Sequence, residues 1–273
     1  GRVPEGFALT HFLFNNVGSH GQHSAEHDRA LFNARSAPLR DCAAAMGIPS
    51  IAVDSNLDQF LGGLFQVTHT LRNVTVALVM QHAFAKFMYS SGYPLGETRV
   101  GRDDNMSRLD PVILPWLGTE RLECIAAGGQ HTRTEKTRRV LDVPQSRHYL
   151  DVCVTPSNAP AGYTNCGMCW KCIRTAVTIK IYGRLDEYGA VFPRANVELF
   201  ENLYLIEAMG GSSPYAREVR DLIRARGYPV PRAVGVIAAL APSFLCQQMS
   251  IRVIPFLIRR SRLAALASKL LSW

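Results

Sequence analysis

The stretch NCGMCWKCIRT, residues 165–175, decides how this chain can fold. It contains three cysteines, Cys166, Cys169 and Cys172, spaced three residues apart, and Gly167 allows a tight backbone turn between the first two. Cysteines at this spacing can direct their thiolates at one metal ion, and closed structural zinc sites hold the ion in a tetrahedron of four ligands. The spacing therefore predicts a metal site that needs one further ligand from elsewhere in the chain.

The best candidate for the fourth ligand is Cys153. It is expected near the end of a strand over 148–154, and the loop that follows contains Pro156, Pro160 and Gly162, which can return the chain to the same point. Four thiolates leave no open coordination position. The ion would therefore brace the fold rather than take part in a reaction.

Other interpretations of the cysteines stay open at this stage. Four thiolates also suit an iron–sulfur cluster, and four unligated core cysteines are the plain alternative. A zinc ribbon that binds nucleic acid would normally show two separated pairs of cysteines instead of this triplet. Cys42, Cys124 and Cys246 are isolated in the sequence and are expected to be ordinary buried residues. Seven cysteines in all, with no secretory signal at the start, favour a reducing cytoplasm.

Composition limits the class of protein. The 273 residues are 47% apolar and 19% charged, which fits a packed globular chain and excludes a disordered one. This length allows one large domain, or one domain with a helical annex. The net charge of +8 suits a polyanionic partner, whether nucleotide phosphates, nucleic acid or an anionic membrane, without choosing among them. A soluble basic surface with no such partner is the alternative.

Hydrophobic patterning predicts an α/β fold. Residues 7–17 read as a buried strand, 24–46 as a helix that Gly47 ends, and 48–54 as a second strand. This order with short connections is a βαβ unit, which implies a parallel sheet. Further predicted elements are a helix over 71–87, strands over 87–92 and 121–127, and a helix over 135–141.

The character of the sequence changes after about residue 185. Residues 197–208 and 215–226 alternate apolar and charged residues in the helical period, and from Ala233 the chain is apolar with scattered basic residues. A helical extension over 193–273 is the main expectation. A basic amphipathic segment that lies on a membrane or contacts another protein is the alternative, since the apolar run 233–245 is too short to span a bilayer.

The cysteine segment, together with GGQHTRTEKT at 128–137, resembles the 7-cyano-7-deazaguanine synthase-like branch of the ATP-pyrophosphatase (adenine nucleotide alpha hydrolase, PP-loop) superfamily. The resemblance covers about residues 7–192, and the cysteine pattern is its most specific part. It implies one doubly wound parallel sheet of the HUP type over 1–192, with a zinc knuckle at 150–175. It also implies that all four cysteines ligate zinc.

The same resemblance implies an activity. Members of the superfamily use ATP, with Mg as its counterion, to adenylate a carboxylate or carbonyl oxygen of a small acid or amide. Pyrophosphate is released, and a nitrogen nucleophile then displaces AMP. The expected partners are therefore ATP and a small-molecule substrate, with no specific nucleic acid and a homodimer left open.

One departure from the family gives a second expectation. The family's phosphate loop, Ser-Gly-Gly-x-Asp-Ser, follows its first strand, but no such motif occurs here, and residues 7–17 match the family's second strand. Either the intact protein carries the loop and is an ATP-dependent ligase-type enzyme, or the chain is a catalytically inactive, zinc-stabilised module that binds nucleotide or joins a complex. The loop matters because its backbone N–H groups form the nest for pyrophosphate.

The candidate catalytic residues are Arg133 and Lys136. They lie at a predicted helix start, where Thr132 or Thr134 can cap free N–H groups. By resemblance they face the nucleotide and stabilise the charge that develops as pyrophosphate departs. Arg174, just after the last cysteine, could also point inward or pair locally.

The candidate cofactor-binding residues follow predicted strands, because ligands in open α/β sheets bind beyond the carboxyl ends of the strands. They are Asn16, Gly18 and His20, expected by resemblance to border adenine and ribose, together with Ser90, Ser91 and Gly128. Plain turns are the alternative at each place. His20, His23 and His27 share a helical spacing, but solvated histidines are the simpler interpretation. Glu97 and Asp110 could handle protons, although a solvated surface position is expected for both.

Overall fold

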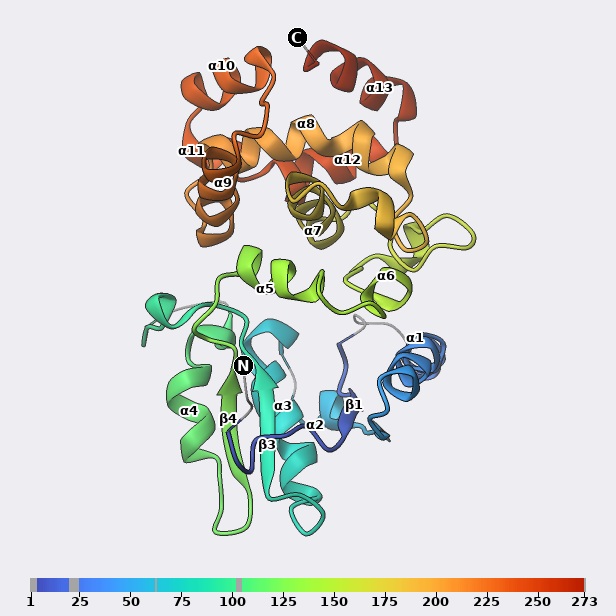
Figure 1. The fold of residues 1–273 in the computed structure, drawn as a ribbon, viewed down its shortest axis with the longest axis vertical. Coiled ribbons are helices and arrows are strands. Elements are labelled where there is room, and N and C mark those ends of the chain that lie inside the picture. Colours follow the sequence, from blue (N-terminus) through green and yellow to red (C-terminus); the bar gives the residue numbers. More distant parts are fainter. Residues whose placement is uncertain (1–3, 20–24, 62, 102–104, 273) are drawn as a thin grey trace. The chain divides into compact units, whose positions relative to one another are not determined.

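The computed structural model describes residues 4–19, 25–61, 63–101 and 105–272. The chain forms two compact units, Gly1–His131 (unit 1) and Thr132–Trp273 (unit 2). The strands β1 to β4 all belong to unit 1, whereas the described part of unit 2 is built of helices (Figure 1). The cysteine segment thus belongs to the same compact unit as the C-terminal helices. A domain boundary near residue 192 stays a prediction.

Unit 1 contains two pairs of parallel strands. Strand β1 (Phe12–Asn16) pairs in parallel with β2 (Ser50–Asp54), and helix α1 (Ala25–Ala45) connects the two strands in the sequence. This arrangement confirms the predicted βαβ unit. Strand β3 (Lys86–Ser90) pairs in the same parallel sense with β4 (Glu123–Ala127). The described strands form two separate two-stranded sheets. The chain is therefore a mixed α/β protein with small parallel sheets.

Helices cover the β3–β4 pair. Helix α3 (Phe65–Val79) begins earlier and ends earlier than the predicted 71–87, because the apolar run marks only the buried part of the helix and a turn at Met80–Ala83 separates it from β3. Helix α4 (Asp110–Trp116) packs on β4. Shorter turns are α2 (Leu57–Phe60), Leu95–Glu97 and Met106–Arg108. The core between these elements consists of Val74, Ala77, Leu114, Leu122 and Cys124.

Unit 2 is organised around helix α8 (Arg194–Gly210), on which α7 (Trp170–Ile181) and α9 (Pro214–Arg226) pack. This arrangement confirms the predicted C-terminal helices. Its centre is apolar, with Ile173, Val177 and other side chains fully buried between α7 and α8. The other helices of the unit are α5 (Arg133–Val140), α6 (Ser146–Tyr149), α10 (Arg232–Leu240), α11 (Ser243–Cys246), α12 (Ile254–Ile258) and α13 (Ser261–Leu270), with short turns at Pro156–Asn158, Leu185–Tyr188 and Met249–Val253.

The strand predicted over 148–154 is wrong. The chain leaves α6 and continues without regular structure to Cys153. Its backbone groups bond to a side chain instead of a neighbouring strand: Asn165 Oδ1 accepts the Val152 N–H at 2.9 Å, and Asn165 Nδ2 donates to the Leu150 carbonyl at 2.8 Å. The buried side-chain amide of Asn165 therefore satisfies backbone groups that a neighbouring strand would otherwise satisfy.

Candidate metal centre

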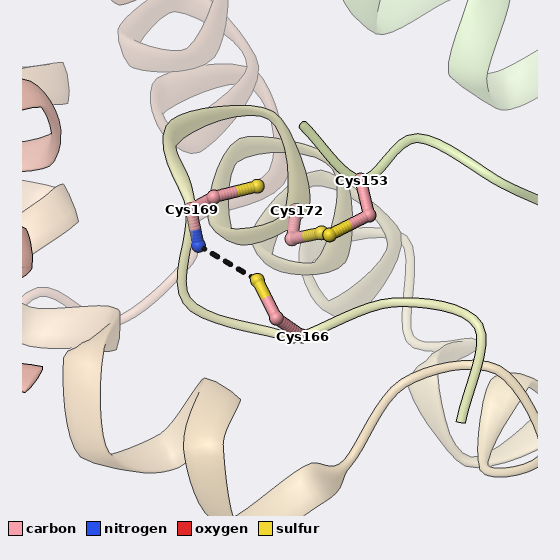
Figure 2. A group of neighbouring side chains, drawn as sticks. All are labelled: Cys153, Cys166, Cys169 and Cys172. Carbon is pink, nitrogen blue, oxygen red and sulfur yellow. Dashed lines mark hydrogen bonds between the residues drawn. The ribbon is translucent and has the colours of Figure 1, made fainter. Parts of the chain in front are cut away.

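The four cysteines singled out from the sequence come together in unit 2. The Sγ atoms of Cys153, Cys166, Cys169 and Cys172 all lie within 4.8 Å of one another (Figure 2). All four residues are buried, and no disulfide joins them. A tetrahedral ion with Zn–S bonds of about 2.3 Å would place its sulfurs about 3.8 Å apart, so this set could hold such an ion. Among the described residues it is the one group of metal-ligating side chains close enough to do so.

A turn and a helix start position three of the ligands. Cys169 is the residue that precedes α7, and Cys172 lies in the first turn of that helix. Cys166 precedes a turn at Gly167, whose φ of +72° suits glycine. A Cβ atom at Gly167 would also lie 3.2 Å from side-chain atoms of both Pro193 and Asn196. Backbone conformation and close packing thus both require glycine between the first two cysteines.

Backbone N–H groups support the Cys166 sulfur. The N–H groups of Met168 and Cys169 donate to Cys166 Sγ at 3.4 and 3.2 Å, and Figure 2 shows the second of these bonds. The side chain of Asn196 donates to the Cys166 carbonyl at 2.9 Å. Hydrogen bonds to a thiolate favour its charged form and orient it toward a metal.

The side chain of Asn165 binds the segment that carries Cys153, and no sequence-based prediction included this residue. Its side chain is fully buried, and its amide donates to the Leu150 and Val191 carbonyls at 2.8 and 3.1 Å. Its oxygen accepts the Val152 N–H, one residue before Cys153. The asparagine next to the cysteine triplet therefore joins the two chain segments that supply the four sulfurs. Its only sequence signal is its place beside Cys166.

The four cysteine thiols cannot all ionise this close together unless a cation balances their negative charge. The hydrogen bond from the Cys153 thiol lowers the pKa of Cys166 to about 6, and contacts with the same thiol also lower the pKa of Cys169. Hydrogen bonds to Cys166 and then Cys169 raise the pKa of Cys153, and hydrogen bonds to Cys153 and then to Cys166 and Cys169 raise the pKa of Cys172. Four thiolates this close repel one another strongly, so a divalent cation is needed for all four to ionise.

A second group of charged residues lies at the start of α5. Thr132 and Glu135 form a capping box: Thr132 Oγ1 accepts the Glu135 N–H at 3.2 Å, and the Glu135 carboxylate accepts the Thr132 N–H at 2.8 Å. The predicted helix start is thereby confirmed, with Thr132 as its cap. Arg133 and Lys136 both lie in the first turns of this helix, where the positive end of the helix dipole favours negative charge.

A carboxylate from α9 occupies this helix start. Glu218 Oε2 accepts the Arg133 backbone N–H at 2.7 Å, while Glu218 Oε1 is buried and makes no hydrogen bond within the described chain. Arg174, from α7, is 8% exposed, and its guanidinium lies 4.1 Å from the centre of the Tyr215 ring. We call Arg133, Lys136, Arg174 and Glu218 the α5 cluster, since their charges interact with one another.

Burial changes the ionisation of the α5 cluster. Burial, and then the neighbouring charge of Arg133, lower the pKa of Lys136 to about 8, although Glu218 opposes the change. Burial raises the pKa of Glu218, while the hydrogen bond from the Arg133 N–H opposes the rise. Glu218 was missed from the sequence because it lies 85 residues from Arg133, with no local pattern to connect them.

The candidate nucleotide-binding residues lie in unit 1. Asn16 ends β1, and its amide donates to Asp54 Oδ1 at 2.7 Å. Gly18 has a φ of +80°, and a Cβ atom there would lie 2.6 Å from the Asp58 side chain, so packing alone requires glycine. His20 and His23 lie outside the described residues, and His27 is exposed on α1. A nucleotide-binding role for these positions stays a prediction.

Ser90, Ser91 and Gly128 lie together at the carboxyl ends of β3 and β4. Ser90 pairs with Ala127 in the register of the two strands, and the N–H of the buried Ser91 donates to the Ala127 carbonyl at 2.9 Å. Gly128 follows with a φ of +79°. The structure thus brings these three residues to one sheet end, while Arg133 and Lys136 belong to unit 2.

The expected surface position of Asp110 is wrong. The carboxylate is fully buried at the start of α4 and accepts a hydrogen bond from Thr70 Oγ1 at 2.7 Å. Burial raises the pKa of Asp110 to about 6. Nearby, the ring of His69 lies 3.0 Å from Tyr89 Oη and 3.1 Å from Ser107 Oγ. Packing of α3 against the turn that precedes α4 creates this buried polar network, which no local sequence pattern signals.

The chain was compared with known proteins. No protein-family model matches it, and comparisons with curated proteins and with solved structures gave no significant match.

Proposed function

We propose that Cys153, Cys166, Cys169 and Cys172 bind one Zn²⁺ ion that stabilises unit 2. The observation that carries this proposal is the convergence of four buried sulfurs within 4.8 Å. A four-iron cluster is larger than a single ion, so its thiolates would lie further apart. Four thiolates fill a tetrahedral zinc ion, and the ion would therefore act in folding, not in a reaction.

Elemental analysis of the purified protein tests the metal. We expect one zinc per chain, and loss of the metal from the Cys166→Ser variant. Cys124→Ser is the matched control, because Cys124 is also buried but lies in unit 1. Protein that contains no metal, or that contains iron in place of zinc, would overturn the assignment.

We further propose that the chain is the zinc-stabilised part of an ATP-dependent ligase-type enzyme, built on a doubly wound sheet like that of the 7-cyano-7-deazaguanine synthases. The resemblance in residues 128–137 and 165–175 supports this, as do the cations of the α5 cluster. In such a reaction a substrate carboxylate oxygen attacks the α-phosphorus of ATP and the bond to pyrophosphate breaks. A nitrogen nucleophile then attacks the activated carbon, and AMP leaves with the bonding electrons.

Arg133 and Lys136 are the residues proposed to act on the phosphates. Two cations at the positive end of the α5 helix dipole would stabilise the negative charge that grows on pyrophosphate as its bond breaks. Arg174, a buried residue of α7, would add a third cation. Zinc would serve this role indirectly, because it fixes the start of the helix that carries Arg174.

Pyrophosphate release measured with ATP, Mg²⁺ and a panel of small carboxylic acids tests the enzyme. Removing one electrostatic stabiliser typically costs about 10²-fold in rate, which is the loss expected for Arg133→Ala. Arg139→Ala is the control, since Arg139 is exposed on the same helix. If ATP neither binds nor turns over, the enzymatic proposal is wrong, whatever the metal content.

One observation favours a second candidate function. The Ser-Gly-Gly-x-Asp-Ser motif of the family is absent from the 273 residues. A zinc-stabilised module that binds nucleotide or joins a complex, without cleaving ATP, would need no such loop. Calorimetry that shows ATP binding, together with an assay that shows no pyrophosphate release, would favour this function over the ligase.

A further inference from the structure

The positive charge of the chain is concentrated in its last segment. Residues 222–273 contain eight Lys or Arg and no Asp or Glu, while the whole chain has 30 and 22. The preceding residues are therefore balanced at 22 of each sign, and this segment carries the entire net charge of +8. A segment without a single acidic residue has no internal partner for its cations.

Several cations of this segment face solvent without a carboxylate. Arg252, Arg259, Arg260, Arg262 and Lys269 are exposed, and no ion pair joins any of these five to an acidic residue within the described chain. Arg194, an exposed cation in the preceding part of unit 2, by contrast pairs with both Asp186 and Glu198. The C-terminal helices therefore present uncompensated positive charge.

The same helices expose large apolar side chains. In the described chain, ten of the 21 exposed large hydrophobic residues belong to residues 222–273. They include Leu240, Phe244, Phe256, Leu263, Leu266 and Leu270. The Arg260 guanidinium lies 4.4 Å from the centre of the Phe256 ring, so charge and apolar surface are direct neighbours. Exposed apolar groups bordered by cations mark an interaction surface.

Helix α13 shows the pattern most clearly. Leu263, Leu266 and Leu270 recur every three or four residues, so they form one stripe along the helix, and all three are exposed. Arg262 and Lys269 run along the neighbouring stripe, seven residues apart. The opposite side of α13 carries the buried residues Ala264 and Leu271, and the helix packs on α8, as α10 does (Figure 1). The leucines and cations thus face outward together.

We propose that α10–α13 form a docking surface for an anionic lipid bilayer. Cations at the level of the headgroups and leucines that enter the upper acyl region are what an interfacial amphipathic helix requires. The charge argues against a second copy of this chain as the occupant, since two such surfaces would repel. The exposed leucines argue against nucleic acid, whose phosphates they cannot contact. No described helix is long and apolar enough to cross a membrane, so the chain would lie on the bilayer.

Co-sedimentation of the purified chain with vesicles tests this surface. We expect binding to vesicles of phosphatidylcholine and phosphatidylglycerol in equal parts, weaker binding at high salt, and none to phosphatidylcholine alone. The Leu266→Asp, Leu270→Asp double variant should lose binding. Lys269→Gln should weaken it about fivefold, since a cation near an anionic surface contributes about that factor.

Matched controls separate this surface from general effects. Leu64→Asp in unit 1 changes a leucine that is 65% exposed, close to the 63% of Leu270, and Arg139→Gln removes one cation from another exposed helix face. Neither should change vesicle binding. Melting curves and circular dichroism establish that each variant is folded.

Three results would overturn the proposal. They are no vesicle binding by the parent chain, binding that the leucine double variant retains, and a salt-sensitive homodimer in light scattering that the same variant abolishes without any lipid binding.

Discussion

At the residue scale, Lys136 and Glu218 are the two members of the α5 cluster whose ionisation predicts how the cluster binds anions. Burial favours the neutral form of each side chain. It lowers the pKa of Lys136 to about 8 and raises the pKa of Glu218. Glu218 nevertheless holds its place because it accepts the Arg133 N–H at the start of the helix. A carboxylate in that position resembles a bound oxyanion, so the cluster already has an internal occupant.

The pKa of Lys136 predicts how anion binding depends on pH. Sulfate keeps the same charge across this range, so its affinity should fall as pH rises through about 8, where the ammonium loses its proton. In Lys136→Arg the guanidinium stays charged, and the fall should disappear. Calorimetric titration between pH 6 and about 9 measures both. An identical fall in the arginine variant would assign the titration to another group.

Replacement of the internal carboxylate predicts stronger anion binding. Glu218→Gln keeps the shape of the side chain and removes its negative charge, so sulfate should bind about tenfold more tightly, equivalent to about 1.4 kcal/mol. Asp221→Asn is the control, because it removes an exposed charge from the same helix. Equal effects of the two substitutions would mean that only the overall charge of the unit matters.

At the scale of elements, the knuckle depends on one turn. Gly167 has a φ of +72° in a place where a Cβ atom would lie 3.2 Å from Pro193 and Asn196, whereas Gly162 has a φ of +85° with open space around it. The two glycines share a backbone conformation and differ in packing. Substitution at Gly162 therefore measures the cost of backbone strain alone, and substitution at Gly167 measures strain together with steric conflict.

Alanine at these two glycines should destabilise the protein unequally. Gly162→Ala should cost about 1 kcal/mol, the usual penalty of a left-handed conformation for a residue with a Cβ atom. Gly167→Ala should cost about 1–3 kcal/mol more, because Pro193 and Asn196 must shift. Urea unfolding of the metal-loaded proteins measures both. Equal losses of unfolding free energy would show that Pro193 and Asn196 can shift without an energetic cost.

At the scale of the whole molecule, the proposed ion ties distant chain segments into unit 2. Its ligands come from the irregular segment at Cys153, from the turn at Gly167 and from the start of α7, whose buried face packs on α8. The binding free energy of a structural zinc ion is on the order of 10 kcal/mol and is expressed as folding stability. Unit 1 has its own core and contributes none of the four sulfurs.

Removal of the metal by a chelator should therefore destabilise unit 2 and leave unit 1 unchanged. When the metal is removed, hydrogen exchange should rise through α7 and α8 and stay unchanged in β3 and β4. The Cys166→Ser variant should show the same rise beforehand and no further change with chelator. Mass spectrometry of peptides from both units measures this. A uniform rise across both units would contradict a role of the ion confined to unit 2.

The sequence by itself determined the features that depend on local spacing. The cysteine triplet, the capped helix start at Thr132, the βαβ unit and the C-terminal helices were all predictable, because periodicity and capping act over a few residues. The doubly wound sheet and the ATP-dependent reaction come from family resemblance and stay predictions.

Tertiary structure decided three side-chain contacts between residues distant in the sequence that no local pattern signals. Asn165 replaces the strand predicted at 148–154, and Asp110 is buried against Thr70. Glu218 reaches a helix start 85 residues away in the sequence. The physical reason is the same each time: a side chain satisfies a backbone or polar group in another element, and only packing of the chain brings the two together.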